Sequence, residues 1–552
     1  MPEPRIGTDA SSGRRWSPPS PDAQALQASI DAAIARGDPS VSLRPDETYY
    51  FNSASLNVSS SKGFRLEGNG AKVILALGSS VRVTNARATT IANVVIDYNE
   101  EPASQATILF ASRGCFSAKA EAVVEASRLN DRVCELLVEV MPNFPPPDPS
   151  VRPDLCFWPA CETKLIFFEG NRTHRMSSPQ VVTWLANSTQ VRGRFYTLRT
   201  QPLWGHAVRA GDLVAVAGRR CGPCTYQLIN GSHVTTENVT IHGSCNMAIL
   251  ERGGAGSNAF RRVRVVRPPR SRRLLSASFD GFHSEGSRVA PLLEDSTFEH
   301  IGDDFYNVQD AIQVVLGWTS DGALVVADSS FGSTYSADVR GIGMRLYRPT
   351  EDVWVTKQIG PPATIVESHL MGPSEAAPFR ERARNISATF KARYGWQLAS
   401  FEAQAFSIYR LALDGGGAIR AAGGGYGVLA QMNASFGAVV RRNRFLDGLG
   451  RAMVMNSLGA RVEGNVFSRA MSGGMLVDAE VTWLSGNLGT SRNLSVRDNT
   501  FDACCTSPAP FAQCNASASG IARVMYNAAG ATGIWTSNNT VDALFTVRSG
   551  ER

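Results

Sequence analysis

Three aspartates in the middle of the sequence have a spacing that could support acid–base chemistry. Asp280 lies in a Ser-Phe-Asp-Gly-Phe-His segment, and Asp303 and Asp304 follow in an Ile-Gly-Asp-Asp-Phe segment, so that 303 − 280 = 23 separates the first two in sequence. If the chain coils in parallel strands with that period, Asp280 and Asp303 become neighbours ~4.8 Å apart, with Asp304 beside them. Carboxylates held this close raise one another's pKa, because like charges disfavour ionisation. A protonated carboxyl beside an ionised one is what a general acid and a general base require.

Repeats on both sides of the aspartates predict such a coil. An Asn-Val-x-Ile phrase begins at Asn93 and again at Asn238. An Asn-x-(Phe or Val) phrase recurs near the end of the chain, beginning at Asn443, Asn465, Asn499 and Asn539. The separation of the first two of these is 465 − 443 = 22, a period typical of a solenoid. Asn suits the corners, because it tolerates the left-handed conformation and its amide can bond locally. The Leu and Asn phrase of a leucine-rich repeat is absent, so we expect a parallel β-solenoid.

Two long regions interrupt the repeats and divide the chain. We predict an all-β protein, a right-handed parallel β-helix with two β-rich, barrel-like insertions and a short N-terminal capping helix near Ala25 to Ala35. Insertions at these places would wall a groove over the acids. The expected order is a disordered leader (1–20), N-terminal coils (21–111), a first insertion (112–228), central coils with the aspartates (229–311), a second insertion (312–430) and C-terminal coils (431–552).

Composition narrows the class of protein further. The 50 glycines and 19% charged residues fit a turn-rich β protein. A transmembrane helix needs roughly 18 or more consecutive apolar residues, and the sequence contains no such run. The net charge of +6 is mild for this length and does not indicate nucleic acid as a partner. Ten Asn-x-Ser/Thr sequons favour a secreted glycoprotein. The first twenty residues lack an apolar signal core, so either a signal was removed or the protein is intracellular.

The ten cysteines and a run of arginines allow several interpretations. The clusters Cys156/Cys161, Cys221/Cys224 and Cys504/Cys505/Cys514 allow local disulfides in an oxidising compartment, with a pairing that the sequence does not give. For Cys221 and Cys224, a structural disulfide and free loop thiols are the two main alternatives. A redox role for the Cys-Gly-Pro-Cys sequence, or zinc held by cysteines, is the weaker alternative. Residues 261–273 contain seven arginines, which form either a solvated loop or a surface for sulfated or uronic sugars. No aromatic residues alternate with them, so nucleic acid is not expected.

The chain resembles glycoside hydrolase family 110 within the pectin-lyase-like β-helix proteins. The resemblance rests on several phrases in the family's order: the opening helix near Ala25 to Ala35, Ile96-Asp97-Tyr98-Asn99 with Gln105, Gly211-Asp212-Leu213-Val214 to Arg219, Asp280-Gly281-Phe282-His283, Gly302-Asp303-Asp304 with Asn307-Val308, and Val462-Glu463-Gly464-Asn465-Val466-Phe467. These phrases span roughly residues 22 to 505, with interruptions in the same two places. The aspartate phrase alone is shared in outline with polygalacturonases and indicates only a β-helix glycosidase.

The resemblance implies an inverting α-galactosidase that removes terminal α-1,3-linked galactose, or a related galactoside, from an oligosaccharide or polysaccharide. Asp280, Asp303 and Asp304 would form the acid and base set, in an order that the residues do not decide. Inverting enzymes need carboxyl groups ~6.5–9.5 Å apart, so a diagonal pair is expected to act. We expect substrate contacts from His283, Gln309, Tyr306 and Arg273, and no metal or other cofactor.

One departure from the family pattern, and two other functions, stay open at this level. Gln309 occupies a position where the family commonly has His, and an amide can bond a hydroxyl but cannot carry a proton. The substrate range is therefore open, and an inactive relative is an alternative. The other functions are a carbohydrate-binding or structural β-helix without turnover, and a β-helix lyase or epimerase. The oligomeric state is not indicated by the sequence.

Overall fold

The computed structural model describes most of the coil and the frameworks of both insertions. The described residues are 20–52, 54–112, 116–117, 134–147, 164–170, 182–200, 203–204, 208–217, 223–328, 340–349, 356–394, 407–421, 429–432, 435–470, 473–476, 485–486, 492–502, 504 and 532–541. Residues 1–19 of the expected leader and the cysteines Cys156, Cys161, Cys221, Cys505 and Cys514 lie outside these residues.

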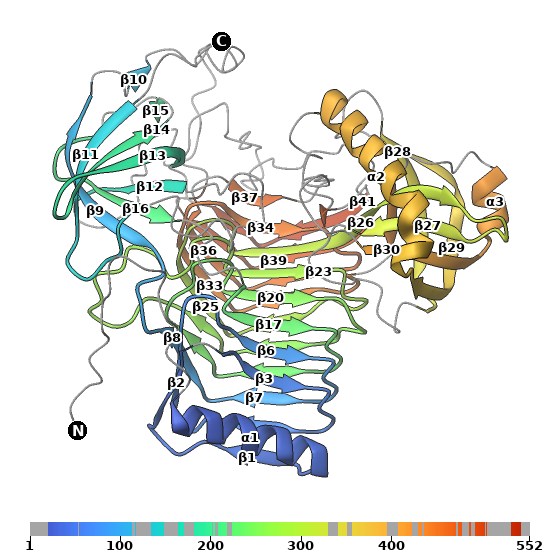
Figure 1. Cartoon of the computed structure of the whole chain (residues 1–552), viewed down its shortest axis with the longest axis horizontal. Coiled ribbons are helices and arrows are strands. Elements are labelled where there is room, and N and C mark those ends of the chain that lie inside the picture. The colour runs from blue at the N-terminus through green and yellow to red at the C-terminus, as the bar shows by residue number, and fades with distance from the viewer. Residues whose placement is uncertain are drawn as a thin grey trace.

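The chain forms a parallel β-helix whose coils stack three sheets, as predicted (Figure 1). The first sheet contains, in spatial order, β1 (Ser40–Ser42), β4 (Arg65–Glu67), β7 (Thr90–Ala92), β18 (Thr235–Glu237), β21 (Ala259–Arg261), β24 (Leu292–Glu294), β32 (Val439–Arg441), β35 (Arg461–Glu463), β39 (Arg492–Arg497) and β41 (Thr532–Ser537). The second sheet contains β2 (Thr48–Phe51), β5 (Lys72–Leu75), β8 (Val95–Tyr98), β19 (Thr240–Ile241), β22 (Arg264–Val265), β25 (Thr297–Ile301), β33 (Arg444–Gly448), β36 (Val466–Ala470), β40 (Thr500–Asp502) and β42 (Thr540–Val541).

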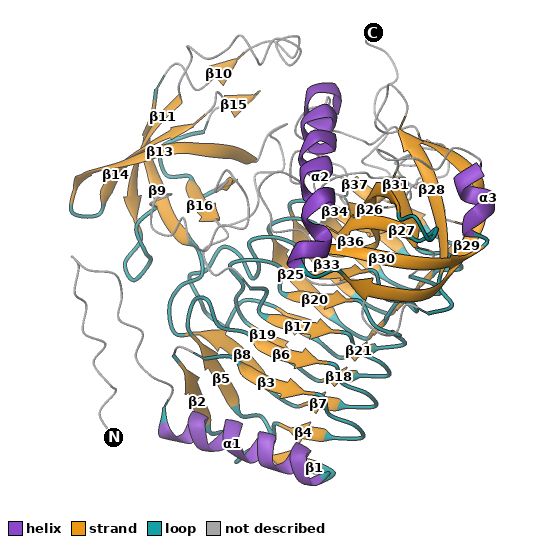
Figure 2. Ribbon diagram, turned by 45° about the vertical axis from the view of Figure 1, so that its right-hand side comes forward, coloured by secondary structure: helices purple, strands orange, loops and turns teal. Residues whose placement is uncertain are grey.

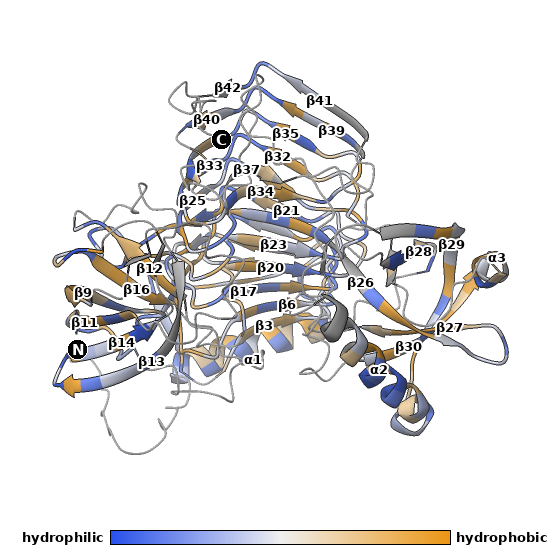
Figure 3. Cartoon of the chain, turned by 90° about the horizontal axis from the view of Figure 1, so that it is seen from above, coloured by the Kyte–Doolittle hydropathy of each residue, from blue (hydrophilic) through white to orange (hydrophobic). Residues whose placement is uncertain are grey.

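The third sheet of the coil is the one that reaches the aspartates. It contains β3 (Leu56–Ser59), β6 (Val81–Thr84), β17 (Tyr226–Ile229), β20 (Ile249–Arg252), β23 (Phe282–Glu285), β26 (Tyr306–Trp318), β34 (Arg451–Met455) and β37 (Gly473–Leu476). Alternate side chains of these strands point into the coil, as in β3, where Leu56 and Val58 are buried. Figure 3 shows the resulting alternation of hydrophobic and hydrophilic segments along the coil strands.

Stacked side chains of one type hold successive coils in register. Phe445 stacks on Phe467 with ring centroids 4.9 Å apart, and Phe467 stacks on Phe501 at 4.8 Å. Asn465 forms one rung of an amide ladder: its Oδ1 accepts bonds from the backbone N–H and the Nδ2 of Asn443, and its Nδ2 donates to Val440 O at 2.9 Å. The ladder satisfies buried backbone N–H and C=O groups at the corners of the coils, as expected. These groups have no partner in a neighbouring strand, so the asparagine amides bond to them instead.

The left-handed conformation belongs to a different residue from the one expected in these C-terminal coils. The residue before each ladder asparagine has the positive φ, as in Arg442 (56°) and Gly464 (63°). In the N-terminal coils the asparagines themselves take it, as Asn93 (56°) and Asn238 (51°) show. Asparagine therefore serves two corner roles, one through its backbone and one through its buried amide.

Helix α1 (Pro21–Arg36) closes the N-terminal end of the coil (Figures 1 and 2). Ser20 caps its first turn, and Gly37 ends it in the left-handed conformation at φ 75°. The buried face carries Ala23, Leu26, Ile30 and Ala33, so an amphipathic helix covers the first coil and protects its strand edges.

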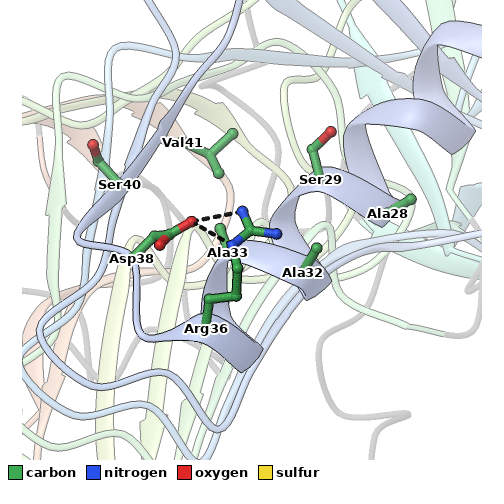
Figure 4. Close-up of a pocket in the computed structure, with 8 residues that line it drawn as sticks. All are labelled: Ala28, Ser29, Ala32, Ala33, Arg36, Asp38, Ser40 and Val41. Atoms are coloured by element: carbon green, nitrogen blue, oxygen red, sulfur yellow. Dashed lines mark hydrogen bonds and ion pairs between the residues drawn. The ribbon is translucent and has the colours of Figure 1, made fainter.

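A surface hollow of about 390 Å³ lies between the C-terminal end of α1 and β1 (Figure 4). The Arg36 guanidinium bonds to Asp38 there, 2.6 Å from its carboxylate. The hollow is lined by Ala28, Ser29, Ala32, Ala33, Arg36, Asp38, Ser40 and Val41. It lies at the end of the coil opposite to β26 and β34, so it does not belong to the aspartate site.

The first insertion is a closed antiparallel barrel. Its strands follow the order β11 (Cys134–Val140), β14 (Phe195–Thr200), β13 (Val182–Arg192), β12 (Lys164–Phe168), β16 (Leu213–Ala217) and β9 (Ser104–Ala111). The short strands β10 (Phe116–Ser117) and β15 (Leu203–Trp204) pair separately. Alternate residues of β11 are buried, which gives the barrel a core of its own.

The second insertion is a ring of antiparallel strands that starts from a coil strand. β26 continues out of the coil and pairs with β27 (Leu324–Asp328) and β31 (Leu429–Met432). The ring is completed by β30 (Ser407–Asp414), β29 (Thr356–Leu370) and β28 (Gly343–Pro349), with helices α2 (Pro373–Tyr394) and α3 (Gly416–Ala421). Figures 1 and 3 place the two insertions on opposite sides of the coil.

The described cysteines include both thiols and disulfide-bonded residues. Cys224 and Cys504 are buried thiols, whereas Cys134 and Cys245 are each disulfide-bonded. Cys224 lies within the coil just before β17, only 6% exposed, as a thiol, which is one of the two states expected for it. Among the described residues, no helix combines the length and apolar character of a membrane span.

An acidic side chain lies inside the coil. Glu251 on β20 is fully buried and accepts hydrogen bonds from Ser284 Oγ at 2.5 Å and Asn258 Nδ2 at 2.7 Å. Burial raises the pKa of Glu251 from 4.5 to about 7, and the hydrogen bonds offset only part of that effect.

We predict that Asn465→Ala lowers the free energy of unfolding by about 3 kcal/mol, because it leaves buried backbone groups without partners. Chemical denaturation measures the loss. Asn385→Ala, at an exposed position of α2, is the matched control and should be neutral or slightly stabilising. Equal effects of the two substitutions would contradict the structural role of the ladder.

We predict that Glu251→Gln stabilises the protein relative to wild type by an amount that grows as the pH rises above about 4.5. The pKa in the folded state lies above the unfolded value, so the stabilising contribution is complete below about pH 4.5 and is lost as the pH rises through about 7. Gln resembles the protonated acid, so wild type and variant should match at about pH 4 and differ by about 3 kcal/mol at about pH 9. Unfolding curves at both pH values test this, and a gap that does not grow with pH would contradict it.

Candidate active site

The coil brings Asp280 against Asp304, the second aspartate of the pair. β23 and β26 pair with Phe282 opposite Tyr306, so the coil period here is 306 − 282 = 24. The Gly281 N–H donates to Asp304 O at 2.9 Å, which continues that register through the turn. The sequence spacing of 23 had placed Asp303 opposite Asp280, and the structure corrects this by one position.

All three predicted carboxylates nevertheless lie together. One oxygen from each of Asp280, Asp303 and Asp304 lies within 4.8 Å of the other two. Asp280 and Asp304 are buried, and Asp303 is half-buried. Two glycines permit the close coil contacts, because a Cβ at Gly302 would lie 2.5 Å from Ser278 O and one at Gly450 would lie 2.4 Å from the Asp303 carbonyl carbon.

Arg451 compensates the charge of this cluster. It begins β34, one coil beyond Asp304 in space although 147 residues later in sequence. Its backbone N–H and its Nε donate to Asp304 Oδ1 at 2.8 and 3.0 Å, and its Nη2 donates to Oδ2 at 2.6 Å. The guanidinium fork therefore holds both oxygens of one carboxylate in a fixed plane.

The electrostatic balance at Asp304 favours a bound proton near neutral pH. Burial raises the pKa of Asp304 from 3.8 to about 7, Arg451 lowers it in part, and the charges of Asp303 and Asp280 raise it further. Carboxylates this close titrate together, so the proton belongs to the cluster. A site with one protonated and one ionised carboxyl can both donate and accept a proton.

His283 also lies in the site, as expected. Its Nδ1 is 2.7 Å from Asp280 Oδ2, and its side chain is 9% exposed. Its register neighbour on β26 is Asn307, whose Nδ2 lies 3.5 Å from Asp304 Oδ2. The pair His283 and Asn307 thus lines the same outer face of the sheet as the carboxylates.

Two of the expected substrate contacts lie elsewhere. Tyr306 is fully buried inside the coil, where its ring stacks on Phe282 at 5.0 Å, because its strand position points inward. Arg273 bonds to Asp97 at 2.7 Å and Glu101 at 2.6 Å and ties the loop after β22 to the N-terminal coils. We correct both assignments: Tyr306 is a core residue, and Arg273 is an ion-paired structural residue. Gln309 lies on the outer face of β26 because its neighbour Val308 points into the coil.

Arg451 is the residue that the sequence interpretation missed. Its signal was present, because the coil phrase Arg444-Phe445 pairs with Thr297-Phe298 on the other side of the insertion. Aligning these two phrases places position 451 opposite position 304. The second insertion separates Asp304 from Arg451 by 147 residues, so a coil period of 22 or 23 residues does not reveal this alignment.

The three aspartates are also the acidic group, among the described residues, whose oxygens are close enough to hold a metal ion. Arg451 already engages both oxygens of Asp304. A cation there would compete with a fixed positive charge at short distance. The donor set therefore fits a bound proton better than a divalent ion.

The sequence matches no protein-family profile and no curated protein. Solved structures with some likeness include the Dettilon tailspike protein (10% identity, TM-score 0.26, 87% of this chain and 51% of that one) and PfbA, a surface adhesin of Streptococcus pneumoniae (8% identity, TM-score 0.28, 96% and 90%). A tailspike protein from Pseudomonas phage LKA1 is similar at 10% identity and a TM-score of 0.16, over 94% and 72% of the two chains. The chain spans about half the length of the Dettilon protein.

Proposed function

We propose that this protein is a glycoside hydrolase that removes terminal α-linked galactose from an oligosaccharide or polysaccharide. The observation that carries the proposal is the cluster of three carboxylates within 4.8 Å, one of which has a pKa raised to about 7. Glycoside hydrolysis uses one carboxylic acid to protonate the leaving oxygen and one carboxylate to assist attack on the sugar. The linkage and the identity of the sugar come from the family resemblance.

The burial of the three groups supports a division of roles. The proton belongs to the cluster and can be donated from Asp303, which is half-buried and therefore the carboxyl best placed to reach a bulky glycosidic oxygen. With that proton on Asp303, the buried Asp280 and Asp304 need only reach a water molecule, which suits a base. His283 bonds to Asp280, and Arg451 bonds to Asp304, so each base has its own positioning residue.

The stereochemistry follows from the resemblance and is less well supported by the distances. The nearest oxygens are closer than the ~6.5–9.5 Å between carboxyl groups in inverting enzymes and near the ~5–5.5 Å of retaining ones. Inversion would require the water and the leaving oxygen to use a diagonal pair of oxygens. An α-galactoside should then release β-galactose first, which proton NMR at early times detects. Release of α-galactose first would show that the enzyme retains the configuration.

Binding without turnover is the second candidate, because the Arg451 fork engages both Asp304 oxygens and could serve only to neutralise them. The alternative of a lyase or epimerase is less well supported, since it needs a cation on these acids.

Asp280→Asn, Asp303→Asn and Asp304→Asn should each lower kcat by about 10²–10⁴-fold on an aryl α-galactoside and on α-1,3-digalactoside, the range for loss of an acid or base. Asp295→Asn, an exposed carboxylate on a neighbouring corner, is the control and should retain activity. If the wild type binds these sugars and releases no galactose, the hydrolase proposal is wrong and carbohydrate binding without turnover is the function supported.

Arg451→Met should move the pH profile of kcat/KM to higher pH by about one unit or more, because a nearby cation lowers a carboxyl pKa by about 1–3 units. The direction of the shift is fixed. Removing a positive charge favours the protonated carboxyl, so the apparent pKa values of both limbs of the profile rise. Arg451→Lys keeps the charge and should restore the profile in large part. A loss of activity with unmoved limbs would make Arg451 a structural residue only.

A further inference from the structure

The outer face of β23, β26 and β34 carries a row of amides beside the aspartates. Tyr306 and Val308 point into the coil, so Asn307 and Gln309 point outward. Met455 pairs with Val308, and the Asn456 N–H donates to Val308 O at 3.0 Å. Asn456 therefore lies beside Gln309, one coil further on.

These amides are buried and have polar atoms without partners. Asn307 Oδ1, Gln309 Oε1 and both side-chain polar atoms of Asn456 make no hydrogen bond in the structure. The three residues are 4%, 3% and 1% exposed. A buried amide that makes no hydrogen bond destabilises a fold, so a cluster of them on adjacent coils indicates groups that a ligand satisfies.

The row is continuous with the carboxylates. Asn307 Nδ2 lies 3.5 Å from Asp304 Oδ2, and Asn307 is the register neighbour of His283, which contacts Asp280. A ligand whose reacting bond lies at the aspartates would extend its other polar groups toward Gln309 and Asn456.

The charges around the row are compensated. Arg252 pairs with Glu285 at 2.6 Å, with both side chains 5% exposed, and Arg451 pairs with Asp304. Glu285 is the register neighbour of Gln309, so a neutral amide follows an ion pair along this column. Among these described residues, the surface offers hydrogen bonds and each cation has an acidic partner, which disfavours a carboxylated or sulfated ligand.

We propose that Asn307, Gln309 and Asn456 are the specificity-determining contacts of this site and bind the hydroxyl groups of an uncharged sugar. This deepens the proposed function and rests on it. An amide both donates and accepts, so Gln309 and Asn456 can together bond adjacent hydroxyls. The alternative of sulfated or uronic sugars, suggested by the arginine run, has no corresponding cation in the row.

The test combines binding with stability, using the full chain and the two apolar near-isosteres Gln309→Met and Asn456→Leu. Free galactose, glucose, mannose, galacturonic acid and galactose 6-sulfate are titrated by calorimetry, so no turnover is needed. Each substitution should weaken binding of the preferred neutral sugar about tenfold, the value of one good hydrogen bond. The melting temperature should stay level or rise, because an unsatisfied buried amide is removed.

Gln313→Met is the matched control. Gln313 is on the same strand, is fully buried and has both amide atoms without partners, but it lies in the second insertion opposite Ala430. It should leave sugar affinity unchanged. A row variant with a lower melting temperature and unchanged affinity would overturn the proposal, as would a wild type that prefers the acidic sugars or binds none of the five. Binding of a neutral sugar without hydrolysis of any galactoside would instead remove the hydrolase and leave the amide row in place.

Discussion

The repulsion between stacked carboxylates is the constraint on which the site depends. Parallel pairing sets adjacent coils ~4.8 Å apart, so Asp280 and Asp304 cannot separate without breaking the register of β23 and β26. Two features make this arrangement tolerable: the Arg451 fork on one side of Asp304, and a proton that burial retains near neutral pH. The same features that relieve the repulsion provide an acid and a base side by side.

The second insertion is part of this arrangement and more than an appendage. β26 leaves the coil through that ring of strands, and the chain returns to the coil only when β32, β33 and β34 complete the next turn. Arg451 reaches Asp304 only if this return is in register, which the Phe298 to Phe445 stack helps to fix at a centroid distance of 5.5 Å. The candidate site therefore forms only when the second insertion has returned the chain to the coil in register, and contacts between residues so far apart in sequence carry a large cost in chain entropy.

Much of the fold was readable from the sequence, because the repeated asparagine and aromatic phrases are themselves the rungs that stack. The same reasoning found the three aspartates and His283. It placed Asp303 opposite Asp280 because strand register depends on turn geometry, which residue counting cannot supply. It took Tyr306 as a sugar contact because an aromatic ring suits both a core and a sugar, and only the inward position on β26 decides between them. Arg273 was one member of an arginine run, and its acidic partners lie far away in the sequence, on the N-terminal coils.

The central claim is that the aspartate cluster holds a proton near neutral pH. Isotope-edited NMR of Asp side-chain carboxyl carbons, followed from pH 4 to 9 in wild type and in Asp304→Asn, measures it directly. We predict one carboxyl signal that titrates close to pH 7 in the wild type and is absent from the variant. Carboxyl signals that have all finished titrating below pH 5 would contradict the claim.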